Sequence, residues 1–172
     1  RKIKGKIVGD ALRRIAKLEV PDPEVMASPK QWRYRGKVNL ASKGAFLGFR
    51  PYHRPGDAFN LGDCLLAKEQ LMELWTTVSS NRKLLPKEME SLVMRIDRVG
   101  GQHVVAVGGR TSWDALPMEA AIGGEKISYW WKPGSGAARV VAGPQTGYPV
   151  VAFEQVNYAM AETIPKSTAG SS

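Results

Sequence analysis

The stretch "SLVMRIDRVGGQHVVAVGG", residues 91–109, decides the fold. Two runs rich in apolar residues, Ser91–Val99 and His103–Gly109, lie on either side of a Gly-Gly pair. Two such runs joined by a short glycine turn are typical of a β-hairpin. We therefore expect an antiparallel pair of strands in the middle of the chain.

The rest of the chain contributes further strands and a few helices. Apolar residues at helical spacing predict an N-terminal amphipathic helix over 2–18 and a second helix over 65–81. Strands are expected at 32–41, 44–50, 58–61, 126–131 and 138–143, with 112–124 a loop that includes one helical turn. The stretch "VVAFEQVNYAMAE", residues 150–162, predicts a buried strand that turns into a helix. The predicted class is α+β: an antiparallel sheet built from hairpins, two or three packed helices, and the N-terminal amphipathic helix.

Composition and charge limit the possible functions. The 172 residues are enough for one domain with a sizeable core, and no apolar run approaches the roughly 20 residues that span a bilayer. The net charge is +9, and residues 1–55 hold 14 Lys or Arg against 4 Asp or Glu. A localised basic region is the expected footprint of a polyanion-binding surface, although a merely soluble basic face is an equal alternative.

Motifs for common enzyme chemistry are absent. The sequence has no G-x-x-x-x-G-K-[ST] loop and no G-x-G-x-x-G after a strand. His53 and His103 lack the spacing of a zinc site. The single cysteine, Cys64, excludes an internal disulfide, suits a reducing and cytoplasmic setting, and is expected to be a small buried hydrophobe. The residues alone therefore predict a basic α+β domain without a visible active site.

Several segments in order resemble the RNA (uracil-5-)-methyltransferase family, whose members form 5-methyluridine with S-adenosylmethionine. They are "KIVGDALRRIAKL", "YRGKVNL", "LGFR", "GDCLLA", "YWWKPGSGAARVVAG" and "FEQVNYAM". The resemblance implies that residues 1–164, with a leading helix at 1–19, are the central RNA-recognition domain of such an enzyme. Residues 165–172 are expected to be a disordered tail or an artificial remnant. The family's catalytic S-adenosylmethionine domain, with its S-C-N-P cysteine, has no counterpart here, so this chain alone is expected to be inactive.

The resemblance also assigns roles to residues of this sequence. It implies that Gln155 binds the cofactor and that Phe153 and Asn157 line the substrate cleft, where a flipped uridine would lie. From the residues alone, Gln155 is better explained as a hydrogen-bonded strand amide. Arg35 and Lys37 match basic positions that face RNA, with Arg33 and Arg50 as additional phosphate contacts. The implied partners are structured RNA, tRNA or rRNA, and the enzyme's own missing C-terminal catalytic domain.

Three alternatives stay open on the sequence. In some members of the family a cysteine at the position of Cys64 is the fourth ligand of an iron–sulfur cluster, a role that we rank below that of a buried thiol. Tyr34, Trp130 and Trp131 could stack on bases, although strand aromatics are more often core. The chain could also be a stand-alone, non-catalytic RNA-binding module, or a domain that binds only proteins.

Overall fold

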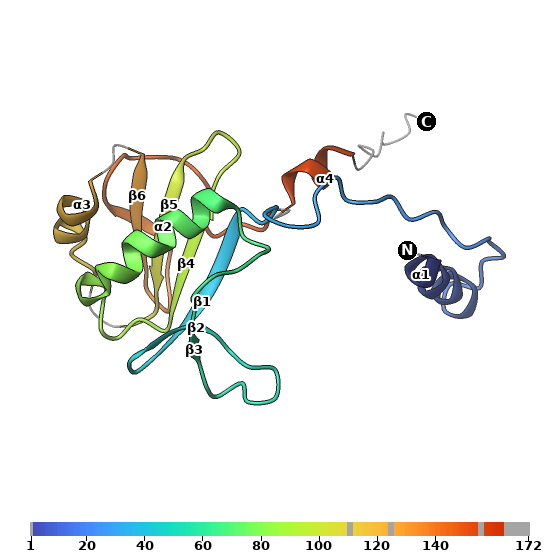
Figure 1. Cartoon of the computed structure of the whole chain (residues 1–172), viewed down its shortest axis with the longest axis horizontal. Helices are drawn as coiled ribbons and strands as arrows, with labels where there is room; N and C mark the ends of the chain where they lie inside the picture. The colour runs from blue at the N-terminus through green and yellow to red at the C-terminus, as the bar shows by residue number, and fades with distance from the viewer. Residues whose placement is uncertain (1, 110–111, 124–125, 155–156, 164–172) are drawn as a thin grey trace. The chain divides into compact units, whose positions relative to one another are not determined.

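The computed structural model describes residues 2–109, 112–123, 126–154 and 157–163, which form two compact units, Arg1–Lys30 and Gln31–Ser172. The larger unit is built on a seven-stranded sheet in the order β3-β2-β1-β4-β5-β6-β7 (Figure 1). The strands are β1 (Lys37–Lys43), β2 (Phe46–Phe49), β3 (Phe59–Asn60), β4 (Ser91–Ile96), β5 (Gln102–Val107), β6 (Ile127–Lys132) and β7 (Arg139–Ala142). The helices are α1 (Lys2–Arg14), α2 (Glu69–Ser80), α3 (Leu116–Ile122) and α4 (Tyr158–Thr163), with a 3-10 turn at Arg82–Leu84.

The predicted central hairpin is confirmed. β4 and β5 pair antiparallel around the glycine turn, with Val93 opposite Val105. The expected α+β class is confirmed too, but the sheet is not made of hairpins throughout, because β5 and β6 pair parallel. A parallel pair needs a crossover, and the stretch expected to be a loop supplies it with α3.

One face of the sheet carries the main core. α2 packs there through Leu71, Leu74, Trp75 and Val78, all of which are buried. The strands contribute alternate residues, because successive side chains point to opposite faces. These include Leu40 of β1, Leu92 and Met94 of β4, Val104 of β5, and Tyr129 and Trp131 of β6. We call this the helix face.

The opposite face is covered only in part. A smaller cluster of Val105, Trp130 and Val150 lies on β5, β6 and the segment that follows β7. Trp130 and Trp131 point to opposite faces and both are buried, so each is a core residue. We call this the second face, and the chain from Pro144 to Glu154 is its covering segment.

Arg95 of β4 holds the covering segment on the second face. Its side chain is 2% exposed, and its Nη1 donates to the carbonyl oxygens of Val150 and Ala152, both at 3.1 Å. Its Nη2 donates to the carboxylate of Glu154, and its guanidinium lies 5.0 Å from the ring centroid of Tyr148. Burial alone would raise the pKa of Glu154, but the Tyr148 hydroxyl, at 2.6 Å, and Arg95 hold it below its usual value.

These bonds explain why the predicted strand within residues 150–162 is wrong. Among the described residues of this stretch, 150–152 form a turn, and Asn157, just before α4, makes an isolated antiparallel bridge to Arg35. The carbonyl groups of Val150 and Ala152, which a strand would use in a ladder, are taken by Arg95 instead. The expected helix does form, as α4.

The helix expected over 65–81 begins later for a similar reason. The N–H groups of Arg33 and Arg35 donate to the carbonyl oxygens of Leu65 and Leu66, both at 2.8 Å. Residues 65–66 therefore form a turn, and Ala67 makes an isolated parallel bridge to Arg35 before α2 begins at Glu69. The strand expected at 32–41 correspondingly begins only at Lys37.

The smaller unit is a helix with an extended segment folded along it. α1 ends at Arg14, before the expected limit of residue 18, and Lys17 has a left-handed φ of 56°. The segment runs against Gly5, where a Cβ would lie 2.6 Å from the carbonyl oxygen of Pro23. Arg13 fastens it by donating to the carbonyl oxygen of Val20 at 2.8 Å and to Asp22 at 2.7 Å. Of the helices described in either unit, none has the length and apolar character that a membrane span requires.

We expect Glu154→Ala to lower the free energy of unfolding by roughly 2 kcal/mol, because it leaves the buried guanidinium of Arg95 without its carboxylate. Chemical denaturation measures this change. Glu88→Ala, at an exposed glutamate, is the matched control and should leave stability unchanged. An equal effect of the two substitutions would contradict the structural role of Glu154.

Stability should also depend on pH through His103, which is 3% exposed on β5. Burial lowers the pKa of His103 below 6.5, while its contact with Asp97 at 3.2 Å acts in the opposite direction. Because the unfolded chain then binds the proton more readily, stability is complete above about pH 6.5 and falls as the pH drops toward the folded-state pKa. Urea denaturation from pH 8 to pH 5 should show this loss.

The second histidine provides the control for this measurement. His103→Gln should flatten the pH dependence over that range, whereas His53→Gln, at an exposed loop residue, should retain it. A slope that survives His103→Gln would assign it to another group.

Candidate nucleic-acid interface

The half of the second face formed by β1 and β2 lies outside the covering segment. Asn39 and Ala41 of β1, Gly48 of β2, and Arg50, Glu90 and Ser91 line a concavity of about 380 Å³ there. Gly48 lines the concavity without a side chain. Only glycine fits at this position, because a Cβ would lie 1.8 Å from the carbonyl oxygen of Phe59. A shallow polar depression of this kind admits a backbone or a flat group.

Of the four predicted RNA-binding residues, Arg50 lines this concavity, and Lys37 and Arg35 lie at and before the start of β1. Lys37 and Asn39 are two residues apart on β1 and therefore share the second face. Arg35 is exposed and precedes a bend at Gly36 before the strand, and Arg50 follows β2. We call Arg35, Lys37, Asn39 and Arg50 the open cationic area. Glu90 is the acidic residue that lines the concavity.

Lys37 lies beside a second positive charge, that of Arg95. It pairs in register with Arg95 of β4, so its ammonium lies on the same face as the buried guanidinium. Partial burial lowers the pKa of Lys37 below its usual value, and the positive charge of Arg95 acts in the same direction. An anion bound there would offset this repulsion.

Arg35 is fixed by its backbone and exposed at its side chain. Its N–H donates to Leu66, and its carbonyl oxygen accepts from the N–H of Lys68 at 2.9 Å. It also bridges to Asn157. This bridge places an exposed arginine beside the start of α4.

Arg33, the fourth predicted residue, makes different contacts. Its φ is 53°, and its guanidinium donates to both carboxylate oxygens of Asp63, each at 2.8 Å, and to the carbonyl oxygen of Cys64 at 3.0 Å. The hydrogen bonds that Arg33 donates to Asp63 raise the pKa of Arg33. Its charge is already shared with a carboxylate, and its RNA-binding role stays a prediction.

The predicted cleft residues lie in and after the covering segment. Phe153 is 87% exposed, and Asn157 accepts a hydrogen bond from the N–H of Met160 at 3.2 Å, as a capping residue does. Gln155 lies outside the described residues. Phe153 and Asn157, an exposed ring and a capping amide, do not by themselves enclose an adenosine or a methionine group.

The metal prediction rests on one partly exposed thiol. Within the described ranges no group of three or more His, Cys, Asp or Glu side chains could hold a metal ion. A cysteine-ligated iron–sulfur cluster needs four thiolates, and the sequence holds Cys64 alone. This chain by itself does not fit such a cluster.

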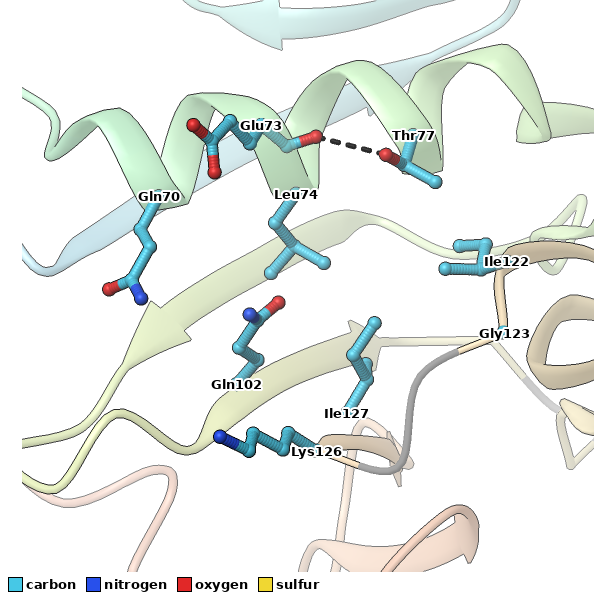
Figure 2. Close-up of a pocket in the computed structure, with 9 residues that line it drawn as sticks. All are labelled: Gln70, Glu73, Leu74, Thr77, Gln102, Ile122, Gly123, Lys126 and Ile127. Atoms are coloured by element: carbon cyan, nitrogen blue, oxygen red, sulfur yellow. Dashed lines mark hydrogen bonds between the residues drawn. The ribbon is translucent and has the colours of Figure 1, made fainter.

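A second concavity, of about 480 Å³, lies between α2 and the first residues of β5 and β6. Figure 2 shows Gln70 and Leu74 of α2 pointing toward Gln102 and Ile127 of the sheet. Its charged side chains are Glu73 and Lys126, of opposite sign. Because these two charges cancel, the second concavity lacks the net positive charge that a polyanion-binding site requires. The open cationic area is therefore the better candidate for binding a polyanion.

Sequence reasoning missed Arg95, Glu154, Tyr148 and Tyr158, which hold the covering segment and α4. The Tyr158 hydroxyl donates to the carbonyl oxygen of Ile96 at 2.9 Å, and Arg98 donates to Glu154 at 3.1 Å. One signal was visible: a lone arginine inside the apolar run "SLVMRI". Arginine is almost never fully buried unless it is paired, so an arginine at this position indicates that an acidic or other polar partner lies nearby.

The sheet, with one face covered by helices and the other covered in part, is a fold shared with part of an RNA-modifying methyltransferase. That protein is the tRNA (uracil-54, C5)-methyltransferase of Pyrococcus abyssi, solved in complex with S-adenosyl-L-homocysteine. The TM-score is 0.51 at 19% sequence identity, and the match covers 83% of this chain and 37% of that chain. No family model matches the sequence, and no curated protein matches it. The similarity therefore shows the fold.

Arg33→Ala should lower the midpoint of thermal unfolding, because it removes the paired hydrogen bonds that hold residues 33–35 against residues 63–67. Arg35→Ala is the matched control, since it removes an exposed side chain and keeps the backbone bonds. Differential scanning calorimetry of the two variants measures the difference. Equal midpoints would show that the Asp63 pair contributes nothing to stability.

Proposed function

We propose that this chain is the RNA-recognition domain of an S-adenosylmethionine-dependent RNA uridine-5-methyltransferase that acts on tRNA or rRNA. The observation that carries the proposal is the open cationic area on the β1–β2 half of the second face. The fold shared with part of a tRNA (uracil-54, C5)-methyltransferase supports the reaction class. Cofactor binding and methyl transfer are proposed for the complete enzyme only.

The chemistry of the open cationic area suits an RNA backbone. Arg35 is exposed, and Arg50 stands at the rim of the polar depression. Each such residue that neutralises a phosphate releases condensed counterions, which favours binding. Asn39 and Ser91 add neutral polar groups that can hydrogen-bond sugar or phosphate oxygens. The area therefore positions RNA rather than reading its sequence.

The covering segment carries an exposed aromatic residue, Phe153, next to Glu154. Glu154 is bonded to Arg95, the register partner of Lys37, so the exposed Phe153 emerges beside the open cationic area. In the complete enzyme, Phe153 and Asn157 would lie at the border between bound RNA and the catalytic domain. A uridine must leave its stack before its C5 can be methylated, and an exposed aromatic ring at such a border could receive it.

The salt dependence of RNA binding tests this function. The double variant Arg35→Ala, Lys37→Ala should bind a structured RNA more weakly and lower the slope of log Kd against log salt by about 2, one unit for each phosphate contact. Filter binding at several salt concentrations measures it. The double variant Lys83→Ala, Lys87→Ala, which removes two exposed charges in the connection after α2, should keep the wild-type slope.

An unchanged slope in the first variant would remove Arg35 and Lys37 from the interface. In the complete enzyme the same variant should reduce methyl transfer from S-adenosylmethionine to RNA uridine chiefly through the KM for RNA. Salt-dependent RNA binding without any methyl transfer by the complete protein would favour a non-catalytic RNA-binding module.

A further inference from the structure

The loop from Arg50 to Ala58, "RPYHRPGDA", joins β2 to β3 and lies at the end of the β2–β3 pair, away from α2 and α3 (Figure 1). Its Tyr52 is 92% exposed. We propose that this loop is a second RNA contact, at which Tyr52 stacks on an unpaired base while Arg54 and Lys43 neutralise the neighbouring phosphates. This inference rests on the proposed RNA-binding function and adds the kind of RNA that is bound.

The loop is held in one shape although it is exposed. The Nη1 of Arg50 donates to the carbonyl oxygen of Pro55 at 3.0 Å, and Lys43 reaches the carbonyl oxygen of Gly56. Inside the loop, the N–H of Arg54 donates to Pro51 at 3.2 Å and that of Asp57 to Arg54 at 2.9 Å. Because the frame is formed in advance, a ligand does not have to order it on binding.

Tyr52 is supported at its edge and open elsewhere. Its ring meets that of His53 at nearly a right angle, 81°, with 5.1 Å between the centroids. In the part of the chain that the structure describes, this is the one ring contact that Tyr52 makes. An aromatic side chain in this position offers a flat apolar surface to a partner, and every base has a matching face.

The charges around Tyr52 favour nucleic acid over protein. Arg54 and Lys43 have side chains that are 76% and 59% exposed, and both lie 3.7 Å from Asp57, the acidic residue of the loop. Two cations share one carboxylate, and Arg50 adds a third positive charge at the base of the loop. The excess of positive charge beside an open ring is the combination found at single-strand binding surfaces.

The base on Tyr52 must be unpaired. Bases in an RNA duplex already stack on each other, and their faces are closed to a side chain. A loop or bulge nucleotide can instead be splayed out. Arg50 borders both this loop and the open cationic area, so one RNA can place a paired stem on the sheet and an unpaired nucleotide on Tyr52.

Fluorescence anisotropy with two labelled RNAs tests the inference: a stem–loop, and a fully paired duplex with the same number of phosphates. Tyr52→Ala should raise the Kd for the stem–loop by about tenfold, since one stacked base is lost, and leave the Kd for the duplex unchanged. Tyr52→Trp should bind the stem–loop as the wild type does. The slope of log Kd against log salt should stay the same in Tyr52→Ala, because no phosphate contact is removed.

Leu116→Ala, at an exposed apolar residue of α3, is the control for loss of exposed apolar surface and should bind both RNAs normally. Equal binding of the stem–loop by Tyr52→Ala and the wild type would overturn this inference, as would an equal loss on both RNAs. If Arg35→Ala with Lys37→Ala still weakens binding in that case, the proposed function stands. A wild-type protein that binds neither RNA overturns both proposals.

Discussion

The buried guanidinium of Arg95 is the constraint on which the second face depends. A charge that is 2% exposed must be paired, and its partners come from Glu154, from two backbone carbonyl groups and from the ring of Tyr148. This arrangement determines the path of the chain after β7 and keeps residues 150–152 out of the sheet. The same contacts leave the β1–β2 half of the face open, with Lys37 and Arg50 at its surface.

Local patterns were enough to predict much of the fold. The Gly100–Gly101 turn between two apolar runs specified the central hairpin, and the α2 stripe of Leu71, Leu74 and Trp75 specified a packed helix. Errors arose where distant residues compete for backbone groups. Leu65 and Leu66 have helical neighbours, yet their carbonyl groups accept from Arg33 and Arg35. The parallel pairing of β5 with β6 is equally invisible in sequence, because strand direction depends on the crossover and not on the strand.

In the candidate site too, features set by neighbouring residues differ from features set by distant ones. Lys37 and Asn39 lie on one face of β1 because successive side chains of a strand alternate between its faces. Arg33 lies outside the strand, and its left-handed φ of 53° accompanies a side chain that turns to Asp63. The shallow depression beside Arg50 could not be predicted at all, because it depends on Gly48 and the carbonyl oxygen of Phe59 approaching across two strands.

The long sequence separation of the Arg95 contacts has a consequence for synthesis of the chain. Its hydrogen-bond partners lie 55 to 59 residues downstream, whereas β4 and β5 pair across a tight turn. Hairpins close early because little loop entropy opposes them, and distant contacts close late. During translation the sheet can therefore assemble while Arg95 is still in water. The ribosome must release Glu154 before the second face is sealed, so this face closes only after the segment next to the open cationic area has emerged.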